Sequence, residues 1–246
     1  MASCSYDSTV KIWSLSTFSL ITTYTGHNKS VYAIEFISND TIASGGLDNT
    51  IQVWSISTGL NLKNINTSSS SVVCLKLLSD NSLASGQSNG LIYIFNFTTG
   101  DLIHYLSGHF NIVYDLELLN SQTLASASQD NTVIIWNLTN SSMIYRLTGH
   151  TNSVNGLKMI SSSLLASSSN DTTIKIWNWY SGSLVSTLAN HTSKVLFSLD
   201  LLSEDILLSG SIDQTVNCWQ ISNRFQQLYY GNISSTITSL ATFDKC

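Results

Sequence analysis

The chain has 246 residues, of which 43% are apolar and only 10% are charged, and its formal net charge is −5. This length and apolar content can supply a substantial hydrophobic core, which excludes wholesale disorder. The ten basic residues are scattered singly, so the sequence offers no electrostatic footprint for nucleic acid or for anionic lipid.

The N-terminal stretch MASCSYDSTV has no basic segment followed by an apolar run, so we expect no signal peptide. No apolar stretch approaches the roughly 18 residues of a membrane-spanning helix. Cys4, Cys74, Cys218 and Cys246 show no C-x-x-C spacing, and we interpret them as free thiols in a reducing compartment. The expectation is a soluble intracellular protein, in the cytoplasm or the nucleus.

The predicted elements are short strands throughout. The chain opens within a repeating unit, because ASCSYDSTVKIW (2–13) matches ASGGLDNTIQVW (43–54). The first complete unit follows: strict alternation in VYAIEF places Tyr32, Ile34 and Phe36 on one face. Its four expected strands are 31–36, the small-residue run 41–46, 50–56 and a weaker strand at 60–65, with turns at 47–49 and 57–59.

A period of 41 residues organises the whole chain. Trp13, Trp54, Phe95, Trp136, Trp177 and Trp219 follow one another in steps of 41, with a last step of 42. Six residues before each stands an acid or its amide: Asp7, Asp48, Asn89, Asp130, Asp171 and Asp213. Four of the five histidines also share one position in the repeat, at 27, 109, 150 and 191, while His104 falls on an expected outer strand.

A single small sheet cannot bury both of its faces. Stacking such sheets gives each one a neighbour, and closing the stack into a ring removes the exposed ends. The sequence therefore predicts an all-β protein, a β-propeller of four-stranded antiparallel blades that forms one domain over residues 1–246.

The stretch GHTNSVNGLKMISSSLLASSSNDTTIKIW (149–177) closely resembles a WD repeat, with its Gly-His, small-residue strand, Asp turn and closing Trp. The resemblance covers essentially the whole chain, and spacing and residue types agree in at least four copies. One departure is consistent, because the residue after the Trp is Ser, Asn or Gln and never Asp.

The two ends of the chain are in phase. NISSTITSLATF (232–243) matches the first strand of a unit, and the N-terminus supplies the other three strands, so the termini would share one blade. Six periods account for the full length, and we expect six blades closed by strand exchange. The alternative is a piece of a seven-bladed or larger propeller.

Two interpretations compete for the repeated polar residues. His150, Asp171 and Ser167 could form a nucleophilic triad, with His as the base. The family resemblance implies instead a structural hydrogen-bond network inside each blade, and the repetition favours this, because an enzyme needs one constellation. The implied networks are His27–Ser44–Asp48–Trp54, His109–Ser126–Asp130–Trp136, His150–Ser167–Asp171–Trp177 and His191–Ser209–Asp213–Trp219.

The third blade, at about 68–107, departs from the pattern. Thr67 and Ser68 replace Gly-His, Asn89 replaces the Asp and Phe95 replaces the Trp. We interpret this as drift where packing alone suffices, and the alternative is a flexible or modifiable loop at TSSSS (67–71). No cluster has metal-ligand spacing and no glycine-rich phosphate loop occurs, so neither metal nor cofactor is expected.

Function should then lie where the blades differ, on the face that carries the Asp turns and the starts of the first strands, called here the top face. In WD-repeat proteins this face often receives peptides or partner domains. The residues expected there are mostly Tyr, Leu and Ile and almost uncharged: Tyr6, Tyr32, Leu47, Ile112, Tyr114, Gln129, Asn155, Asn170, Lys194, Leu196, Ile212 and Ile237.

The leading hypothesis is a non-enzymatic scaffold that binds a peptide or protein segment on the top face, as a monomeric domain within a complex. Without an Arg cluster, a neutral or apolar segment is favoured over a phosphorylated or strongly acidic one. The alternative is a propeller that binds a small molecule or carbohydrate. A hydrolase would need one unique, solvent-open Ser/His/Asp set, which the sequence does not show.

Overall fold

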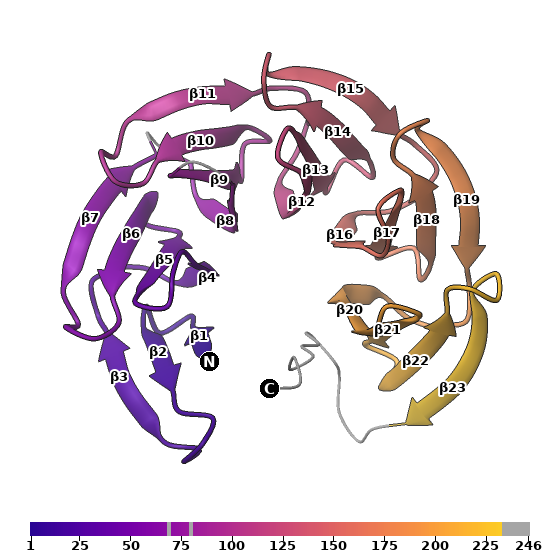
Figure 1. Cartoon of the computed structure of the whole chain (residues 1–246), viewed down its shortest axis with the longest axis horizontal. Coiled ribbons are helices and arrows are strands. Elements are labelled where there is room, and N and C mark those ends of the chain that lie inside the picture. The colour runs from indigo at the N-terminus through magenta and orange to yellow at the C-terminus, as the bar shows by residue number, and fades with distance from the viewer. Residues whose placement is uncertain (68–69, 79–80, 233–246) are drawn as a thin grey trace. The chain divides into compact units, whose positions relative to one another are not determined.

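The structure, a computed structural model, describes residues 1–67, 70–78 and 81–232. Within this described part the chain forms 23 strands and no helix. The strands make six antiparallel sheets, five of them four-stranded and one three-stranded (Figure 1). The predicted fold class, all-β with six propeller blades, is therefore confirmed. The chain divides into two compact units, Met1–Leu116 and Glu117–Cys246.

The first unit holds three sheets in chain order, and the expected strands of its first complete blade are confirmed to within one residue. The strands are β1 (Ala2–Cys4), β2 (Val10–Trp13) and β3 (Leu20–Tyr24); β4 (Val31–Phe36), β5 (Thr41–Gly46), β6 (Thr50–Ser55) and β7 (Asn61–Asn66); β8 (Val72–Leu77), β9 (Ser82–Gln87), β10 (Ile92–Asn96) and β11 (Leu102–Leu106).

The strand β12 (Val113–Asn120) begins in the first unit and ends in the second. The second unit continues with β13 (Thr123–Ser128), β14 (Val133–Asn137) and β15 (Ser142–Leu147); β16 (Val154–Met159), β17 (Leu164–Ser169), β18 (Ile174–Asn178) and β19 (Ser183–Leu188); β20 (Val195–Ser203), β21 (Ile206–Ser211), β22 (Thr215–Gln220) and β23 (Gln226–Asn232).

The N-terminal segment forms the three strands that the phase of the repeat predicts, in the order β1-β2-β3. The sequence predicts that residues 232–243 supply the remaining strand of this sheet, which is the first strand of the repeat unit. Of these, 233–243 lie outside the described residues, so closure by strand exchange stays a prediction.

Small side chains in the second strand of a sheet allow the next sheet to approach closely. A Cβ atom added at Gly45 in β5 would stand only 2.3 Å from Val72 Cγ1 in β8. A side chain at this position would therefore clash with the neighbouring sheet. This explains why the second strand of each repeat unit is a run of small residues.

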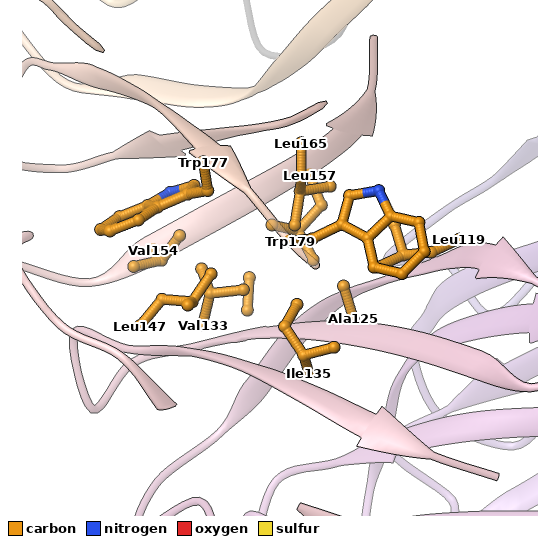
Figure 2. Packing of buried hydrophobic residues seen from close by; sticks show 11 residues of the cluster. Leu119, Ala125, Val133, Ile135, Leu147, Val154, Leu157, Leu165, Trp177 and Trp179 are labelled. Atoms are coloured by element: carbon orange, nitrogen blue, oxygen red, sulfur yellow. The ribbon is translucent and has the colours of Figure 1, made fainter. Parts of the chain in front are cut away.

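The core lies between successive sheets. Figure 2 shows one such layer, in which Val133 and Leu147 of the sheet β12–β15 lie opposite Trp177 of the sheet β16–β19, and Ala125 and Ile135 lie opposite Leu165. All of these side chains are buried. The sheets β4–β7 and β16–β19 thus each bury both of their faces against neighbouring sheets of their own unit.

The Asp turns share an unusual backbone conformation at the residue that follows the Asp or its amide. The left-handed region is occupied there by Ser8, Asn49, Gly90, Asn131, Thr172 and Gln214, with φ between 63° and 87°. Glycine and Asn adopt this conformation readily, whereas a β-branched residue such as Thr is strained in it.

Replacing Thr172 with Asn is expected to raise the free energy of unfolding by about 1 kcal/mol, because Asn tolerates the left-handed conformation better. The φ of Thr172 is 73°, close to the 70° of Asn131 in the preceding blade. Urea unfolding measures the gain, and the reverse change Asn131→Thr serves as the control. A loss of stability in Thr172→Asn would contradict the strain argument.

Candidate functional site

The repeated His, Asp, Ser and Trp form a continuous hydrogen-bond network in the sheet β16–β19. His150 Nδ1 lies 2.7 Å from Asp171 Oδ2, and its Nε2 lies 2.8 Å from Ser167 Oγ. Trp177 Nε1 donates to the same Oγ at 2.8 Å. Because Ser167 Oγ accepts from the indole, its own hydrogen can point to His150 Nε2, and Nδ1–H then donates to Asp171. The donors run in one direction, from Trp to Ser to His to Asp.

The carboxylate at the end of this chain also holds the turn. Asp171 Oδ1 accepts from Thr173 N at 3.0 Å and from Thr173 Oγ1 at 2.7 Å, and Oδ2 accepts from Thr151 N at 3.0 Å. Asp171 therefore ties the turn between β17 and β18 to the segment that enters β16. This is the side-chain-to-backbone bonding that Asp supplies in turns.

The same network occurs in two other sheets. In β4–β7, the His27 Nδ1–Asp48 Oδ2, His27 Nε2–Ser44 Oγ and Trp54 Nε1–Ser44 Oγ distances are 2.8, 2.8 and 2.9 Å. In β20–β23, the corresponding distances among His191, Asp213, Ser209 and Trp219 are 3.1, 2.9 and 2.9 Å. The geometry that the family resemblance implied for these sets is present in the structure.

The glycine before the histidine has a packing reason. A Cβ atom added at Gly26 would stand 2.2 Å from Trp54 Cη2. The indole therefore packs directly over the glycine, and only a residue without a side chain leaves space for it.

The sheet β12–β15 contains the Trp–Ser and Asp–Thr hydrogen bonds of the remaining predicted set. Trp136 Nε1 donates to Ser126 Oγ at 2.7 Å, and Thr132 N donates to Asp130 Oδ1 at 3.0 Å. His109 is buried. Since His109 belongs to the first unit and Asp130 to the second, the pair between them stays a prediction.

In the third blade a glutamine replaces the histidine network. Phe95 is buried at the Trp position, and it has no donor for Ser85 Oγ. The side-chain amide of Gln87 has one orientation in which both its oxygen and its nitrogen form hydrogen bonds. In this orientation Gln87 Oε1 accepts from Ser85 Oγ at 2.8 Å, and Gln87 Nε2 donates to Ser70 O at 3.0 Å. This sheet therefore keeps a buried polar network of different composition. Ser68, predicted at the His position, lies outside the described residues.

The connectivity of Ser167, His150 and Asp171 equals that of a nucleophilic triad, so accessibility decides between the two interpretations. Ser167 is 0% exposed, and its Oγ also accepts the indole hydrogen bond. A substrate carbonyl cannot reach this oxygen. The arrangement can hold a turn against a sheet, and it occurs in full in three separate sheets.

Burial and hydrogen bonding shift the pKa values of the network carboxylates in opposite directions. Burial raises the pKa of Asp171, but the hydrogen bonds from His150 and Thr173 outweigh it, so the pKa lies well below the ordinary 3.8. The pKa values of Asp48 and Asp213 are lowered by the same balance. For His191, burial lowers the pKa below the ordinary 6.5, and the neighbouring Asp213 compensates only in part.

These shifts predict that acidification destabilises the fold in two steps. His191 has a lower pKa in the folded chain, so the unfolded chain binds more protons and stability falls as the pH drops below 6.5. The carboxylates have lowered pKa values too, so a second loss follows as the pH drops below 3.8. Urea unfolding at a series of pH values measures both steps. Stability that rises between pH 7 and pH 5 would contradict the first.

On the top face of the first unit, two tyrosines form an exposed pair. Tyr6, in the turn between β1 and β2, is 77% exposed, and Tyr32 in β4 is 40% exposed. Their rings meet edge to face, with centroids 5.4 Å apart and an interplanar angle of 87°. Of the other predicted residues in this unit, Leu47, Ile112 and Tyr114 are half-buried.

A β-bulge explains why Tyr32 points outward. Val31 pairs with Gly46 and Ala33 pairs with Gly45, so Tyr32 stands between them without a partner in the ladder. Bulges of this kind redirect a side chain at the end of a strand. Asn155 in β16 occupies the same position, between Val154 and Gly156.

The prediction that Asn155 contributes an exposed contact is wrong. Asn155 is only 3% exposed, and its Nδ2 donates to Asn170 Oδ1 at 2.8 Å and to Val195 O at 3.1 Å. A short amide can fold back from the bulge onto these acceptors, whereas the Tyr32 ring cannot. Asn155 therefore links β16 to the turn before Asp171 and to β20.

The other predicted residues of the second unit differ in exposure. Lys194 is exposed, and Gln129, Asn170 and Ile212 are half-buried. Leu196 lies in β20, but its side chain is not among those described, and Ile237 lies outside the described residues.

One aromatic residue escaped the sequence analysis. Phe110 follows His109 directly and is 86% exposed, in the segment that enters β12. The equivalent positions after the other histidines hold Asn28, Thr151 and Thr192. From the sequence, we compared the residues that lie five positions after each His. A comparison of the residues that directly follow each His could have found Phe110.

Among the described residues, no group of three or more His, Cys, Asp or Glu side chains could hold a metal ion. In the same part of the chain, no helix is long and apolar enough to cross a membrane.

Comparison with known proteins identifies the repeat. A family model for the WD domain, G-beta repeat, matches residues 1–14, 18–55, 100–137, 141–178 and 182–220. The unmatched stretch 56–99 contains Asn89 and Phe95, where this chain departs from its own pattern. No curated protein matches the chain. Among solved structures, the computationally designed Ika8 protein is similar, with 28% identity over 99% of this chain and 74% of that chain and a TM-score of 0.86.

Proposed function

Because the chain belongs to the WD domain, G-beta repeat family, we propose that it is a non-enzymatic interaction scaffold that binds a peptide or protein segment on its top face. Propellers of this family serve generally as protein-interaction scaffolds. The observation that carries the proposal is the exposed pair of Tyr6 and Tyr32. Large aromatic side chains supply contact area at little entropic cost and are enriched among the residues that dominate binding energy.

The pair stands on backbone that is already ordered. Ser30 Oγ donates to Tyr6 O at 3.1 Å, and Val31 N donates to Ser5 O at 3.0 Å. These bonds tie the turn that carries Tyr6 to the start of β4, which carries Tyr32. A partner would meet a surface whose geometry is set before binding, which lowers the ordering cost of association.

The chemistry of the pair favours a neutral or apolar segment with polar backbone groups. Each ring offers an apolar face and a hydroxyl that can donate or accept. The proposal gives no catalytic role to Ser167 and its equivalents, which are buried within the sheets. It requires no metal, cofactor, nucleic acid or membrane, and it places the domain in the cytoplasm or nucleus as a monomer within a complex.

Affinity capture with the double variant Tyr6→Ala/Tyr32→Ala tests the proposal. We expect the recovery of direct partners, measured by quantitative mass spectrometry, to fall at least about ten-fold, as for two truncated hot-spot residues. Phe18→Ala is the control, because Phe18 is an exposed aromatic residue in the turn between β2 and β3, at the other end of its sheet. Unchanged recovery with the double variant, at unchanged melting temperature, would place binding elsewhere.

A further inference from the structure

A pocket of about 370 Å³ lies in the second unit, where β16 and β20 end opposite the Asp turns. These two first strands are neighbours. The pocket is lined by Met159, Ile160, Ser161, Ser162, Leu201 and Glu204. Its volume is within the range of sites that accept a side chain or small ligand.

The sequence of the turn after β16 explains the space. Residues 161–163 are three serines, whereas the equivalent positions at the end of β20 and in the turn after it hold Ser203, Glu204 and Asp205. The short serine side chains leave a hollow that longer side chains would fill. Its walls are apolar, because Met159, Ile160 and Leu201 line it.

The walls are anchored by contacts just inside the pocket. Lys158 Nζ lies 2.7 Å from Asp200 Oδ1, which joins the two strands directly before Met159 and Leu201. Met159 N donates to Glu117 Oε1 at 3.1 Å. The ion pair therefore holds β16 beside β20 at the pocket, and the bond to Glu117 fixes the end of β16 to β12.

The charge at the pocket is negative. Glu204 is exposed and makes no hydrogen bond or ion pair with any residue of the described chain. The adjacent Asp205 is already engaged, since its carboxylate accepts from Ser222 N at 2.7 Å and from Gln220 Nε2 at 3.0 Å. The nearby cation, Lys158, is paired with Asp200. One carboxylate is therefore available beside an apolar hollow.

We propose that this pocket binds a partner's peptide segment in which an apolar side chain is followed by Lys or Arg. The apolar side chain fills the hollow between Met159 and Leu201, and the cation pairs with Glu204. The site lies at the opposite end of the sheets from the top face, so it is a second interaction surface, and its test does not depend on the Tyr6–Tyr32 proposal.

The three methionines make the test direct. With the full chain labelled at the methionine methyl groups, Met159 reports on the pocket, while Met1 and Met143 serve as internal references. The probes are the acetylated, amidated tetrapeptides ALKA and ALEA. We expect ALKA to shift the Met159 methyl resonance alone, and to bind at least about three-fold more tightly than ALEA, as an exposed ion pair allows.

Two variants separate the two parts of the site. Glu204→Gln should abolish the preference for ALKA over ALEA, and Asp101→Asn, which changes the net charge equally in the turn before β11, should keep it. Ser162→Leu should fill the hollow and abolish the Met159 shift, and Ser181→Leu in the turn before β19 is its control. A Met159 resonance that ALKA leaves unmoved at millimolar concentration would overturn the proposal, and so would equal binding of the two peptides.

Discussion

Replacing Trp177 with Ala is expected to lower the free energy of unfolding by about 3–5 kcal/mol, the usual cost of deleting a buried aromatic side chain. Trp177 is 2% exposed and lies in the apolar layer between two sheets (Figure 2). The truncation removes this packing, and it also removes the donor to Ser167 Oγ. Urea unfolding followed by circular dichroism measures the change.

The variant Trp177→Phe tests how much a smaller aromatic ring can replace. It keeps a phenyl ring but loses Nε1 and part of the buried volume of the indole, so we expect a cost of about 1–3 kcal/mol, below that of Trp177→Ala. The chain contains a natural precedent, because Phe95 is buried at the equivalent position in β10. Equal losses for Trp177→Phe and Trp177→Ala would contradict a stabilising role for aromatic packing at this position.

Asp171→Ala is expected to lower the free energy of unfolding by about 1–3 kcal/mol, because buried donors lose their acceptor. His150 Nδ1, Thr151 N and Thr173 N all bond to this carboxylate. No specific binding should be abolished, since Asp171 acts on the turn. Thermal and urea unfolding check the stability, and capture of direct partners checks binding.

Asp7→Ala is the matched control for this change. Asp7 has the same place in the repeat, and it accepts from Thr9 N at 2.9 Å as Asp171 does from Thr173. Asp7 is exposed, however, so water can replace its hydrogen bonds and we expect little change. If Asp171→Ala and Asp7→Ala had the same small effect, the buried network would not stabilise the fold.

The spacing of Trp and Asp predicted most of the fold because both residue types act locally. The Asp bonds to the backbone two residues further on, as Asp48 does with Thr50. The Trp reaches a serine in the adjacent strand of its own sheet, as Trp54 does with Ser44. Contacts of this range recur with the period of the chain, so they can be read from one sequence. The histidine partners followed from the family resemblance.

The parts that sequence analysis missed are those that do not repeat with the period of the chain. Gln87 gave no signal, because it accepts from Ser85 Oγ only in the one blade whose His position holds a serine. The pocket beside Met159 likewise depends on Leu201 and Glu204, about one period further on.

By itself, the sequence determined the blade and its strands, since both are built from residues close in the chain that repeat every 41 positions, and the resemblance to WD repeats implied the buried polar network. Only the tertiary structure decided which variable residues face solvent. Tyr32 and Asn155 share one bulge position, yet Tyr32 is exposed and Asn155 is buried. The difference comes from size and from acceptors on neighbouring segments, because Asn155 reaches Val195 O of the next sheet. Periodicity carries no information about that contact.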